Sequence, residues 1–374
     1  MTILIVISFI YIGLIGSFIY GFNKLNVTKY ENTLPKNSFS IVIPFRNEAH
    51  NLPSLLQSLT QINYPEKLFE IILINDESTD NFKPIIDNFK KQNPNINIKV
   101  ISSKRLTVSP KKDAINTAIT FADFNWIATT DADCKVSKKW LQLFNQFIEK
   151  NNPLFISARV KFKLKNSFLH HFQNLNFLSL IGSTIGGFGI HKPFMCNGAN
   201  LCYHKDTFKD LKGFEGNSEL ASGDDIFLLE KFKTKYPNKV LFLKSEQAIV
   251  STNSEESWML FFNQQIRWAS KTTSYSNGFS KIVALIIFIE NLSLLSFAIF
   301  SIFVQYYWGY FILLLVLKIV VDFILISKTA LFLKNVTSLN YYLILCFLHP
   351  FYIVFTALFS LIKNYEWKGR KFSK

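Results

Sequence analysis

Residues 126–133 read Trp-Ile-Ala-Thr-Thr-Asp-Ala-Asp, an apolar segment that ends in two carboxylates, Asp131 and Asp133, with one residue between them. At the carboxyl end of a β-strand, this spacing can direct two carboxylate oxygens at one hard divalent cation. Proteins usually hold Mg²⁺ by one or two carboxylates together with the phosphates of a substrate. The triplet alone occurs by chance in many chains, so its meaning depends on the segments around it.

Strand-like and helix-like patterns alternate between residues 25 and 280. Short apolar runs predict strands, and apolar residues at helical spacing fill the intervals between them. This alternation predicts a parallel α/β sheet with helices on both faces, and ligands of such sheets bind outside the carboxyl ends of the strands. Strands are expected at residues 39–44, 71–74, 98–101 and 126–129, and polar residues follow three of them at 46–48, 75–76 and 131–133.

Long apolar runs on both flanks of this region predict membrane helices. Residues 1–23 carry no charged side chain and can span a bilayer. A cleaved signal peptide fits less well, because the start lacks basic residues and no small-x-small cleavage site follows. Lysines at positions 24, 29 and 36 then favour a cytoplasmic location for the following domain.

The C-terminal part predicts two to three further membrane helices. Residues 282–327 fit a hairpin of two spans that turns near residues 306–309. A third run at 341–362 contains His349-Pro350, and a third full span would leave the basic tail outside the membrane, against the charge rule. We therefore expect a bent or interfacial segment there. The expected domains are 1–23 (membrane helix), 24–280 (catalytic domain) and 281–374 (membrane domain with a basic tail).

The composition of the chain indicates which classes of binding partner to expect. The 374-residue chain has a formal net charge of +15, which nucleic-acid binding could explain. With several membrane segments present, anionic lipid headgroups and an anionic nucleotide substrate explain the charge better, so no nucleic-acid partner is expected. The four cysteines form no CxxC pair, so disulfides and zinc are not expected, in agreement with a reducing cytoplasm.

Six short segments in order resemble the family 2 glycosyltransferases with a GT-A fold, over most of residues 39–270. The QxxRW motif is complete at residues 264–268, and 223–225 (Gly-Asp-Asp) resembles the family's (T)ED element with Asp224 in place of the glutamate. Asn75 and Glu77 depart from the family's DDGSTD element at 74–80, where Glu77 replaces a glycine. The other segments are 41–48 (opening strand and turn), 111–116 (KAGALN) and 130–133 (metal motif).

This resemblance implies roles for individual residues. A nucleotide-diphosphate sugar needs a cation on its leaving group and a base for the acceptor's hydroxyl proton. Asp131 and Asp133 would hold Mg²⁺ or Mn²⁺, and Asp225 would be the base. Arg267 would contact the leaving phosphates through two parallel hydrogen bonds. The implied catalytic residues are Asp225, Asp224, Arg267, Trp268 and Gln264, and the implied nucleotide-binding residues are Glu48, Asp76, Lys111 and Asp131.

Simpler explanations compete with several of these roles. Asp224 and Asp225 could cap the following helix, Asp76 could be an ordinary turn residue, and Asp131 and Asp133 could be solvated turn carboxylates. Arg267-Trp268 could anchor the chain at the membrane interface. Residues 166–195 could face the acceptor or simply pack in a core. His170 and His171 are neighbours on a helix and point different ways, while Lys318 and Asp322 are expected to neutralise each other.

The sequence thus predicts an integral-membrane, inverting, metal-dependent glycosyltransferase. It would move a sugar from a nucleotide-sugar, most simply a UDP-sugar, to a lipid or lipid-linked glycan acceptor at the cytoplasmic face of a bacterial cell membrane. A processive polysaccharide synthase is the alternative, although three or four spans are few for a polysaccharide channel. A catalytically inactive membrane scaffold is an alternative of another class.

Overall fold

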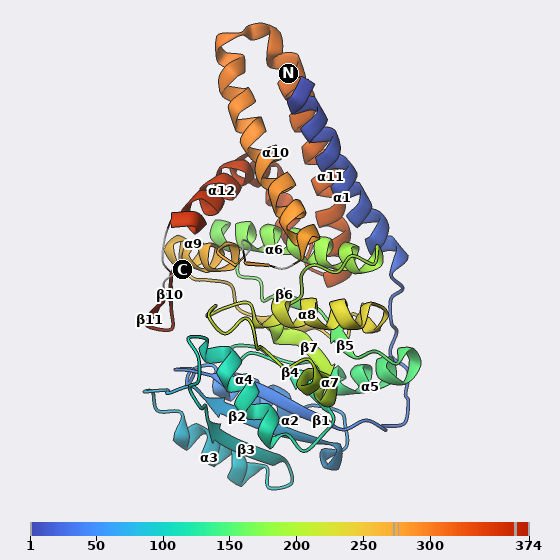
Figure 1. Cartoon of the computed structure of the whole chain (residues 1–374), viewed down its shortest axis with the longest axis vertical. Helices are drawn as coiled ribbons and strands as arrows, with labels where there is room; N and C mark the ends of the chain where they lie inside the picture. The colour runs from blue at the N-terminus through green and yellow to red at the C-terminus, as the bar shows by residue number, and fades with distance from the viewer. Residues whose placement is uncertain (1, 272–273, 276, 363–364, 373–374) are drawn as a thin grey trace. The chain divides into compact units, whose positions relative to one another are not determined.

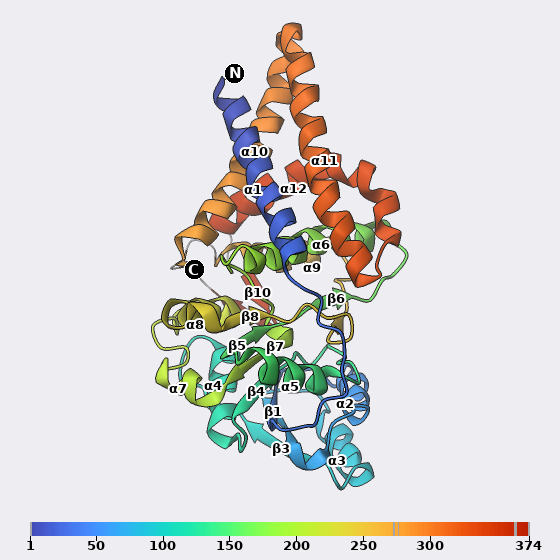
Figure 2. The same cartoon turned by 90° about the vertical axis from the view of Figure 1, so that its right-hand side faces the viewer.

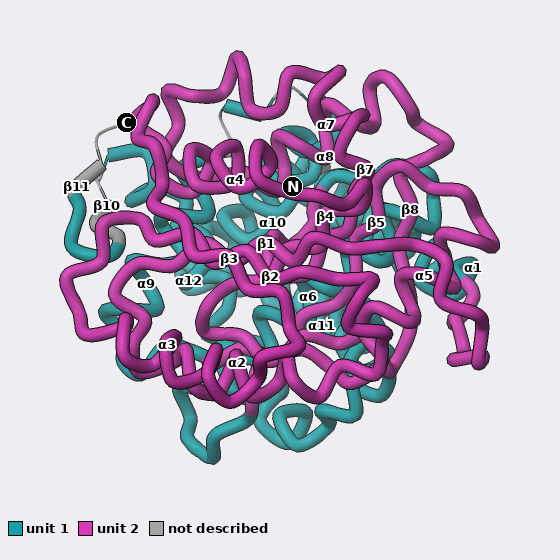
Figure 3. Tube along the Cα trace, turned by 90° about the horizontal axis from the view of Figure 1, so that it is seen from below, with its two compact units in different colours: residues 1–25, 164–194, 254–374 teal, residues 26–163, 195–253 magenta. Residues whose placement is uncertain are grey.

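The computed structural model describes residues 2–271, 274–275, 277–362 and 365–372, shown in Figure 1. Contacts within the chain divide it into two compact units, coloured separately in Figure 3. Residues 26–163 and 195–253 form the sheet unit. Residues 1–25, 164–194 and 254–374 form the helical unit. The domain boundaries expected at 23/24 and 280/281 stay predictions, and the contacts group residues 164–194 and 254–280 with the long helices.

The sheet unit is built on a seven-stranded sheet in the order β3-β2-β1-β4-β7-β5-β8. The strands expected from the apolar runs pair in parallel, with Phe45 opposite Asn75 and Asn75 opposite Ser102. Their carboxyl ends therefore meet at one edge. The four strands are β1 (Phe39–Phe45), β2 (Phe69–Asn75), β3 (Asn97–Ser102) and β4 (Trp126–Thr129).

The rest of the sheet corrects the expectation of a wholly parallel arrangement. β7 (Leu201–His204) lies between β4 and β5 (Phe155–Ser157) and runs antiparallel to both, while β8 (Val240–Phe242) is parallel to β5. The chain between β5 and β7 includes one long helix at residues 168–189, and β7 enters the sheet in the opposite direction to β5. A separate two-stranded ribbon pairs β6 (Val160–Phe162) with β9 (Val250–Thr252).

Helices cover both faces of this sheet, as the alternating pattern predicts. Figure 3 shows α4 (Pro110–Phe121) on one side of the strands, and α2 (Leu52–Thr60) and α3 (Lys83–Gln92) on the other. The apolar face of α2 is fully buried at Leu52 and Leu55, because every third or fourth residue points at the sheet. The other helices of the unit are α5 (Trp140–Asn151), α7 (Lys205–Asp210) and α8 (Asp224–Lys235).

Within its described residues, the helical unit contains four helices that are long and apolar enough to cross a membrane, one N-terminal and three C-terminal. The hairpin expected over 282–327 is present, and Figures 1 and 2 show its two helices side by side. The third C-terminal helix continues through Pro350 without ending, and its location in the membrane stays a prediction. The four are α1 (Thr2–Lys24), α10 (Gly278–Phe303), α11 (Trp308–Leu333) and α12 (Tyr342–Ile362).

Two more α-helices belong to this unit, α6 (Phe168–Gly189) and α9 (Trp258–Ala269). α6 packs against α1 and α11, which accounts for its apolar surface by core packing. The approach to α1 is so close that a Cβ added at Gly186 would lie 2.4 Å from the carbonyl oxygen of Phe18. Only glycine lets the two backbones meet there.

Several polar side chains inside the helical unit are paired. Lys318 donates to Asp322 at 2.6 Å, which confirms the predicted i,i+4 pair, and the hydroxyl of Tyr11 donates to the same carboxylate at 2.6 Å. His170 and His171 bond different partners, Ser254 and Ser338, as neighbours on a helix must. These contacts satisfy groups that would be costly to leave unpaired among apolar helices.

Candidate active site

Three segments that are distant in sequence bring charged side chains together at the carboxyl edge of the sheet. The ammonium of Lys111, in the first turn of α4, lies 2.7 Å from Asp131 Oδ1 and 3.3 Å from Asp224 Oδ2. Asp131 follows the end of β4, and Asp224 is the first residue of α8. The structure therefore joins three of the residues that the resemblance implied.

Lys111 is held in its charged form. Burial acts to lower the pKa of Lys111, but the carboxylates of Asp131 and Asp224 attract the ammonium more strongly and raise this pKa above its ordinary value. Lys111 therefore remains cationic at neutral pH and compensates part of the negative charge of the cluster. An ammonium fixed at this edge of the sheet can also attract a phosphate of a bound nucleotide.

Asp133 points to a different partner from Asp131. Its Oδ2 accepts a hydrogen bond from the Thr252 hydroxyl at 3.1 Å, and Thr252 ends β9. The neighbouring Cys134 thiol lies 3.5 Å from Asp133 Oδ1. Burial and then the negative charges of Asp133 and Asp131 raise the pKa of Cys134 well above its ordinary value.

The donor atoms at this edge fit a hard divalent cation. Asp131 and Asp133 supply carboxylate oxygens, which suit Mg²⁺ and Mn²⁺. The adjacent Thr130 hydroxyl is buried and has no hydrogen-bond partner. Among the described residues, no group of three or more His, Cys, Asp or Glu side chains could hold a metal ion. A cation bound here would therefore need oxygens from a substrate, and the assignment of Asp131 and Asp133 as ligands stays a prediction.

Asp225 is oriented by backbone N–H groups. Its Oδ2 accepts from the N–H of Gly198 at 3.1 Å, and its Oδ1 accepts from the N–H of Ile226 at 2.8 Å. The N-cap residue of α8 is Gly223, with φ of +88°, and a glycine has no side chain that could cap the helix. Asp224 pairs with Lys111, whereas Asp225 accepts from an N–H in the first turn of α8, as the capping alternative expects. The role of Asp225 as the base stays a prediction.

Gly198 is a site residue to which sequence reasoning assigned no role. A Cβ at this position would lie 3.1 Å from Asp224 Oδ2 and 3.2 Å from Lys111 Nζ. The Thr129 hydroxyl also donates to its carbonyl at 2.8 Å, so the glycine backbone is held from both sides. A glycine within Asn197-Gly198-Ala199-Asn200 was the only local signal.

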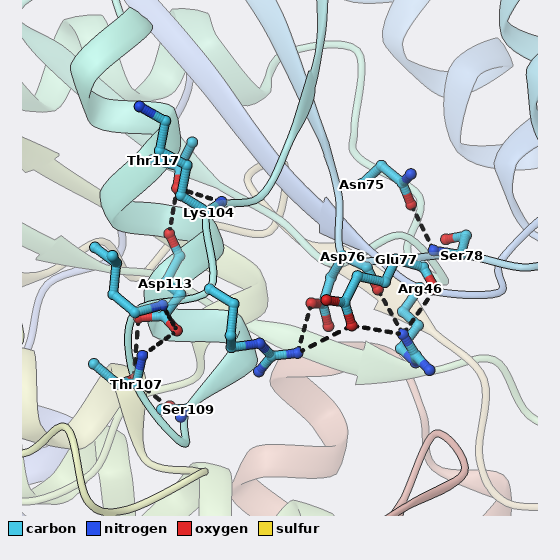
Figure 4. A network of polar contacts seen from close by, with 12 residues as sticks. Arg46, Asn75, Asp76, Glu77, Ser78, Lys104, Thr107, Ser109, Asp113 and Thr117 are labelled. Carbon is cyan, nitrogen blue, oxygen red and sulfur yellow. Dashed lines mark hydrogen bonds and ion pairs between the residues drawn. The ribbon is translucent and has the colours of Figure 1, made fainter.

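A second polar cluster surrounds Asp76, which follows β2 and is buried. Figure 4 shows Asp76 and Glu77 beside Arg46, whose guanidinium donates to both backbone carbonyls at 2.8 Å. Arg105 Nη2 lies 3.1 Å from Asp76 Oδ1. Arg105, which the motifs did not indicate, thus fixes this carboxylate. Asp76 is more than an ordinary turn residue because its side chain is bound by a distant arginine.

The two departures from the family's motif, Asn75 and Glu77, have defined conformations in this turn. Glu77 has φ of +54°, the left-handed conformation that glycine adopts easily. The side chain of Asn75 accepts from the N–H of Ser78 at 2.9 Å, as an aspartate would. A glutamate in a left-handed conformation costs about 1 kcal/mol.

The neighbouring loop is shaped by a buried carboxylate. Asp113 Oδ2 accepts from the N–H groups of Leu106 at 3.0 Å and Thr107 at 2.8 Å, and Figure 4 shows Asp113 beside Thr107. This anchors the segment that carries Arg105. Glu48, after β1, is buried and accepts from the Asn51 side chain at 2.6 Å. The nucleotide-binding roles of Glu48 and Asp76 stay predictions.

The QxxRW residues belong to the helical unit, on α9. Gln264 donates through Nε2 to Glu255 Oε1 at 2.8 Å, while Arg267 and Trp268 are half-buried. Their action on a substrate held by the sheet unit stays a prediction, as does the alternative that Arg267 and Trp268 anchor the chain at a membrane interface.

Two family models match this chain. Glycosyl transferase family 2 matches residues 40–211, and Glycosyl transferase family group 2 matches residues 126–360, which is more than half of the chain. The chain therefore belongs to the family 2 glycosyltransferases.

Individual relatives agree with this assignment. The chain is 31% identical over 163 residues to a poly-beta-1,6-N-acetyl-D-glucosamine synthase of Staphylococcus epidermidis, over 43% of this chain and 37% of the relative. It is 24% identical over 197 residues to the glycosyltransferase AglE of Haloferax volcanii, over 52% of this chain and 60% of that relative. The matched regions thus span between about a third and three-fifths of these relatives.

A solved structure confirms the fold. The mannosyltransferase PcManGT from Pyrobaculum calidifontis, solved in complex with GDP-Man and Mn²⁺, superposes with a TM-score of 0.60 and 15% identity. The similarity covers 96% of this chain and 98% of that chain. The predicted combination of a GT-A sheet domain with one N-terminal and several C-terminal helices is therefore correct.

Proposed function

We propose that this protein is an integral-membrane, inverting, metal-dependent enzyme that transfers a sugar from a nucleotide-sugar to a lipid or lipid-linked acceptor at the cytoplasmic membrane face. The observation that carries the proposal is the cluster in which Lys111 joins Asp131 to Asp224 at the sheet edge. Asp133 and Asp225 belong to the same two segments. The cluster combines candidate ligands for a cation with a candidate base, which is what transfer from a nucleotide diphosphate requires.

In this proposal, the acceptor oxygen attacks the anomeric carbon while the bond from that carbon to the diphosphate breaks. Asp225 takes the proton of the acceptor hydroxyl, and the nucleotide diphosphate leaves. A bound divalent cation supplies positive charge that stabilises the leaving diphosphate. Asp131 and Asp133 would hold this cation. Arg267 would add a delocalised positive charge to the same phosphates.

The nature of the donor is proposed from the site and from the relatives together. The nucleobase would contact Asp76, and Glu48 and Lys111 would line the rest of the nucleotide pocket. PcManGT was solved with GDP-Man and Mn²⁺, which supports a nucleotide-sugar and a divalent cation for this fold. The relative named as a poly-beta-1,6-N-acetyl-D-glucosamine synthase supports a nucleotide-linked N-acetyl-D-glucosamine as the first donor to test.

Two acceptor modes follow from different observations. Four helices suited to a membrane and a cluster at the sheet edge support transfer to a membrane-borne lipid, one sugar at a time. The similarity to the poly-beta-1,6-N-acetyl-D-glucosamine synthase supports the second candidate, a processive synthase. Four spans are few for an enclosed polysaccharide path, so we favour single transfer.

The test is a donor screen with the full-length chain in detergent-lipid micelles. Labelled UDP- and GDP-sugars are supplied with Mg²⁺, Mn²⁺ or EDTA, and transfer to extracted membrane lipids is measured. The matched variants are Asp133→Ala and Asp87→Ala, since Asp87 is an exposed aspartate of α3 in the same unit. We expect metal-dependent transfer that Asp133→Ala abolishes and Asp87→Ala leaves intact.

The number of sugars per lipid then separates the candidates. One sugar per lipid supports the proposal, and long chains on one lipid support the processive synthase. Absence of turnover with every donor, in a chain that is folded by its melting curve, would refute the enzymatic proposal and favour an inactive scaffold.

A further inference from the structure

A chain of hydrogen bonds inside the helical unit runs through the first two residues of the QxxRW motif, Gln264 and Gln265, to Glu255. Asn176 Nδ2 on α6 lies 3.1 Å from the Tyr352 hydroxyl on α12, which donates to Gln265 Oε1 on α9 at 2.7 Å. Gln265 Nε2 donates to Gln264 Oε1 at 3.2 Å. Gln264 Nε2 then donates to Glu255 Oε1 at 2.8 Å. Each side chain in the middle of the chain both accepts and donates.

Such a directed chain fixes the orientation of each amide in it. A primary amide can rotate by half a turn and exchange its oxygen and nitrogen. Gln265 cannot do so here without facing its NH₂ group towards the Asn176 amide and losing the short bond from Tyr352. Because successive hydrogen bonds polarise one another in a low-dielectric interior, the orientation of Gln264 depends on the whole chain.

Burial separates the supporting residues from the motif. Asn176, Gln265 and Tyr352 are all buried, with at most 7% of their surface exposed, whereas Gln264 is half-buried. Figures 1 and 2 both show α9 beside α6. Water is therefore excluded from the supporting bonds, and a lost partner would not be replaced cheaply.

The Glu255 end of the chain is fixed as well. Gln173 on α6 accepts from the N–H of Glu255 at 2.8 Å and donates to its carbonyl at 2.8 Å. This paired contact sets the backbone that carries the Glu255 carboxylate. Gln264 is thus held from two sides. Glu255, which Gln173 of α6 fixes, accepts its hydrogen bond, and Gln265, which Tyr352 of α12 and Asn176 of α6 fix, donates to it.

The ring of Tyr352 is packed independently of its hydroxyl. It stacks on Phe261 with centroids 5.5 Å apart and meets Phe172 edge to face at 5.2 Å. A phenylalanine at this position keeps those contacts, so Tyr352→Phe removes the hydrogen bonds and little else. The hydroxyl of Tyr352 is therefore not needed for packing, and its contribution is the hydrogen bonds that it makes.

We propose that Tyr352 and Asn176 are positioning residues for glycosyl transfer, which hold Gln264, and with it the Arg267 turn of α9, in the orientation needed when the diphosphate leaves. This inference rests on the proposed function, in which the α9 motif acts on the donor. It gives α12 a role in catalysis in addition to any role as a membrane segment. A misplaced contact to the leaving group slows the chemical step more than donor binding.

The test compares two tyrosines in the full-length enzyme, with the donor found in the screen. Tyr352→Phe removes the chain, whereas Tyr342→Phe removes another buried tyrosine bond, to the Ile319 carbonyl at 2.7 Å. We expect Tyr352→Phe to lower kcat roughly 10- to 100-fold, with KM for the donor changed less than about threefold. Tyr342→Phe should lower the melting temperature about as much as Tyr352→Phe does, but it should leave kcat near the wild-type value.

A double-variant comparison checks the route of the effect. If Tyr352 acts through Gln265, then Tyr352→Phe combined with Gln265→Leu should be no slower than Gln265→Leu alone. If the losses in kcat caused by Tyr352→Phe and Gln265→Leu multiply in the double variant, the proposed chain is wrong. Equal kcat for the two tyrosine variants of an active enzyme would also overturn it and leave the proposed function intact. A wild-type chain that turns over no donor would instead refute the proposed function itself.

Discussion

Asp224 and Asp225 are adjacent, but their contacts predict different consequences when each is changed to asparagine. Asp225 accepts only backbone N–H groups in the contacts described above, from Gly198 at 3.1 Å and Ile226 at 2.8 Å. An asparagine oxygen can accept one of these bonds, so Asp225→Asn should change the free energy of unfolding by less than about 1 kcal/mol. It cannot accept the proton of an acceptor hydroxyl.

The expected effect on turnover is large. Base catalysis contributes roughly 10² to 10⁴-fold, so kcat of Asp225→Asn should fall within or beyond that range, about 3 to 5 kcal/mol in the activation barrier. Donor KM should change much less, because the base faces the acceptor. Asp224→Asn instead weakens an ion pair at 3.3 Å, while Lys111 keeps Asp131 at 2.7 Å. We expect about 1 kcal/mol of destabilisation and a fall in kcat below about tenfold.

The assay is single-turnover transfer with saturating donor, alongside thermal melting of each variant. Single turnover isolates the chemical step from product release. A severe loss in Asp224→Asn with a tolerated Asp225→Asn would move the base one residue earlier. Normal turnover in both variants would refute the mechanism proposed for this edge of the sheet.

Three further predictions address metal, topology and packing. Asp133→Ala should abolish Mg²⁺- or Mn²⁺-dependent transfer without lowering the melting temperature by more than a few degrees, and full activity would contradict the assignment. A single cysteine at Lys90 in a cysteine-free background should react with an impermeant reagent only after permeabilisation, and labelling in intact cells would place the sheet unit outside. Gly186→Ala should destabilise the protein by roughly 1 to 3 kcal/mol, because the added Cβ would meet the Phe18 carbonyl at 2.4 Å, whereas Gly13→Ala, with open space around it, should be neutral or slightly stabilising in a thermal melt.

Much of the fold was predictable because it depends on local pattern. Charge-free runs long enough for a bilayer marked the membrane helices, and buried parallel strands read as continuous apolar runs. The polar residues after β1, β2 and β4 could be expected to meet because carboxyl ends of parallel strands share one edge. The antiparallel direction of β7 had no such local signal.

The site itself was only partly determined by sequence. The motif order indicated Lys111, Asp131 and Asp224, but tertiary structure decided that one ammonium joins both carboxylates. Arg105 was missed for the same reason, since its partner, Asp76, is 29 positions away. A side chain's partner depends on where the backbone carries it, and sequence spacing does not encode that position.

The same limit applies to the helical unit. The sequence alone determined that residues 341–362 are an apolar segment interrupted by a proline, and that residues 264–268 complete a motif. Only the folded chain brings Tyr352 to Gln265 across 87 positions, and Asn176 to Tyr352 across 176. A tyrosine in an apolar helix reads as an interfacial anchor or a core residue until its hydroxyl has a partner, because hydrogen-bond direction is a property of three-dimensional packing.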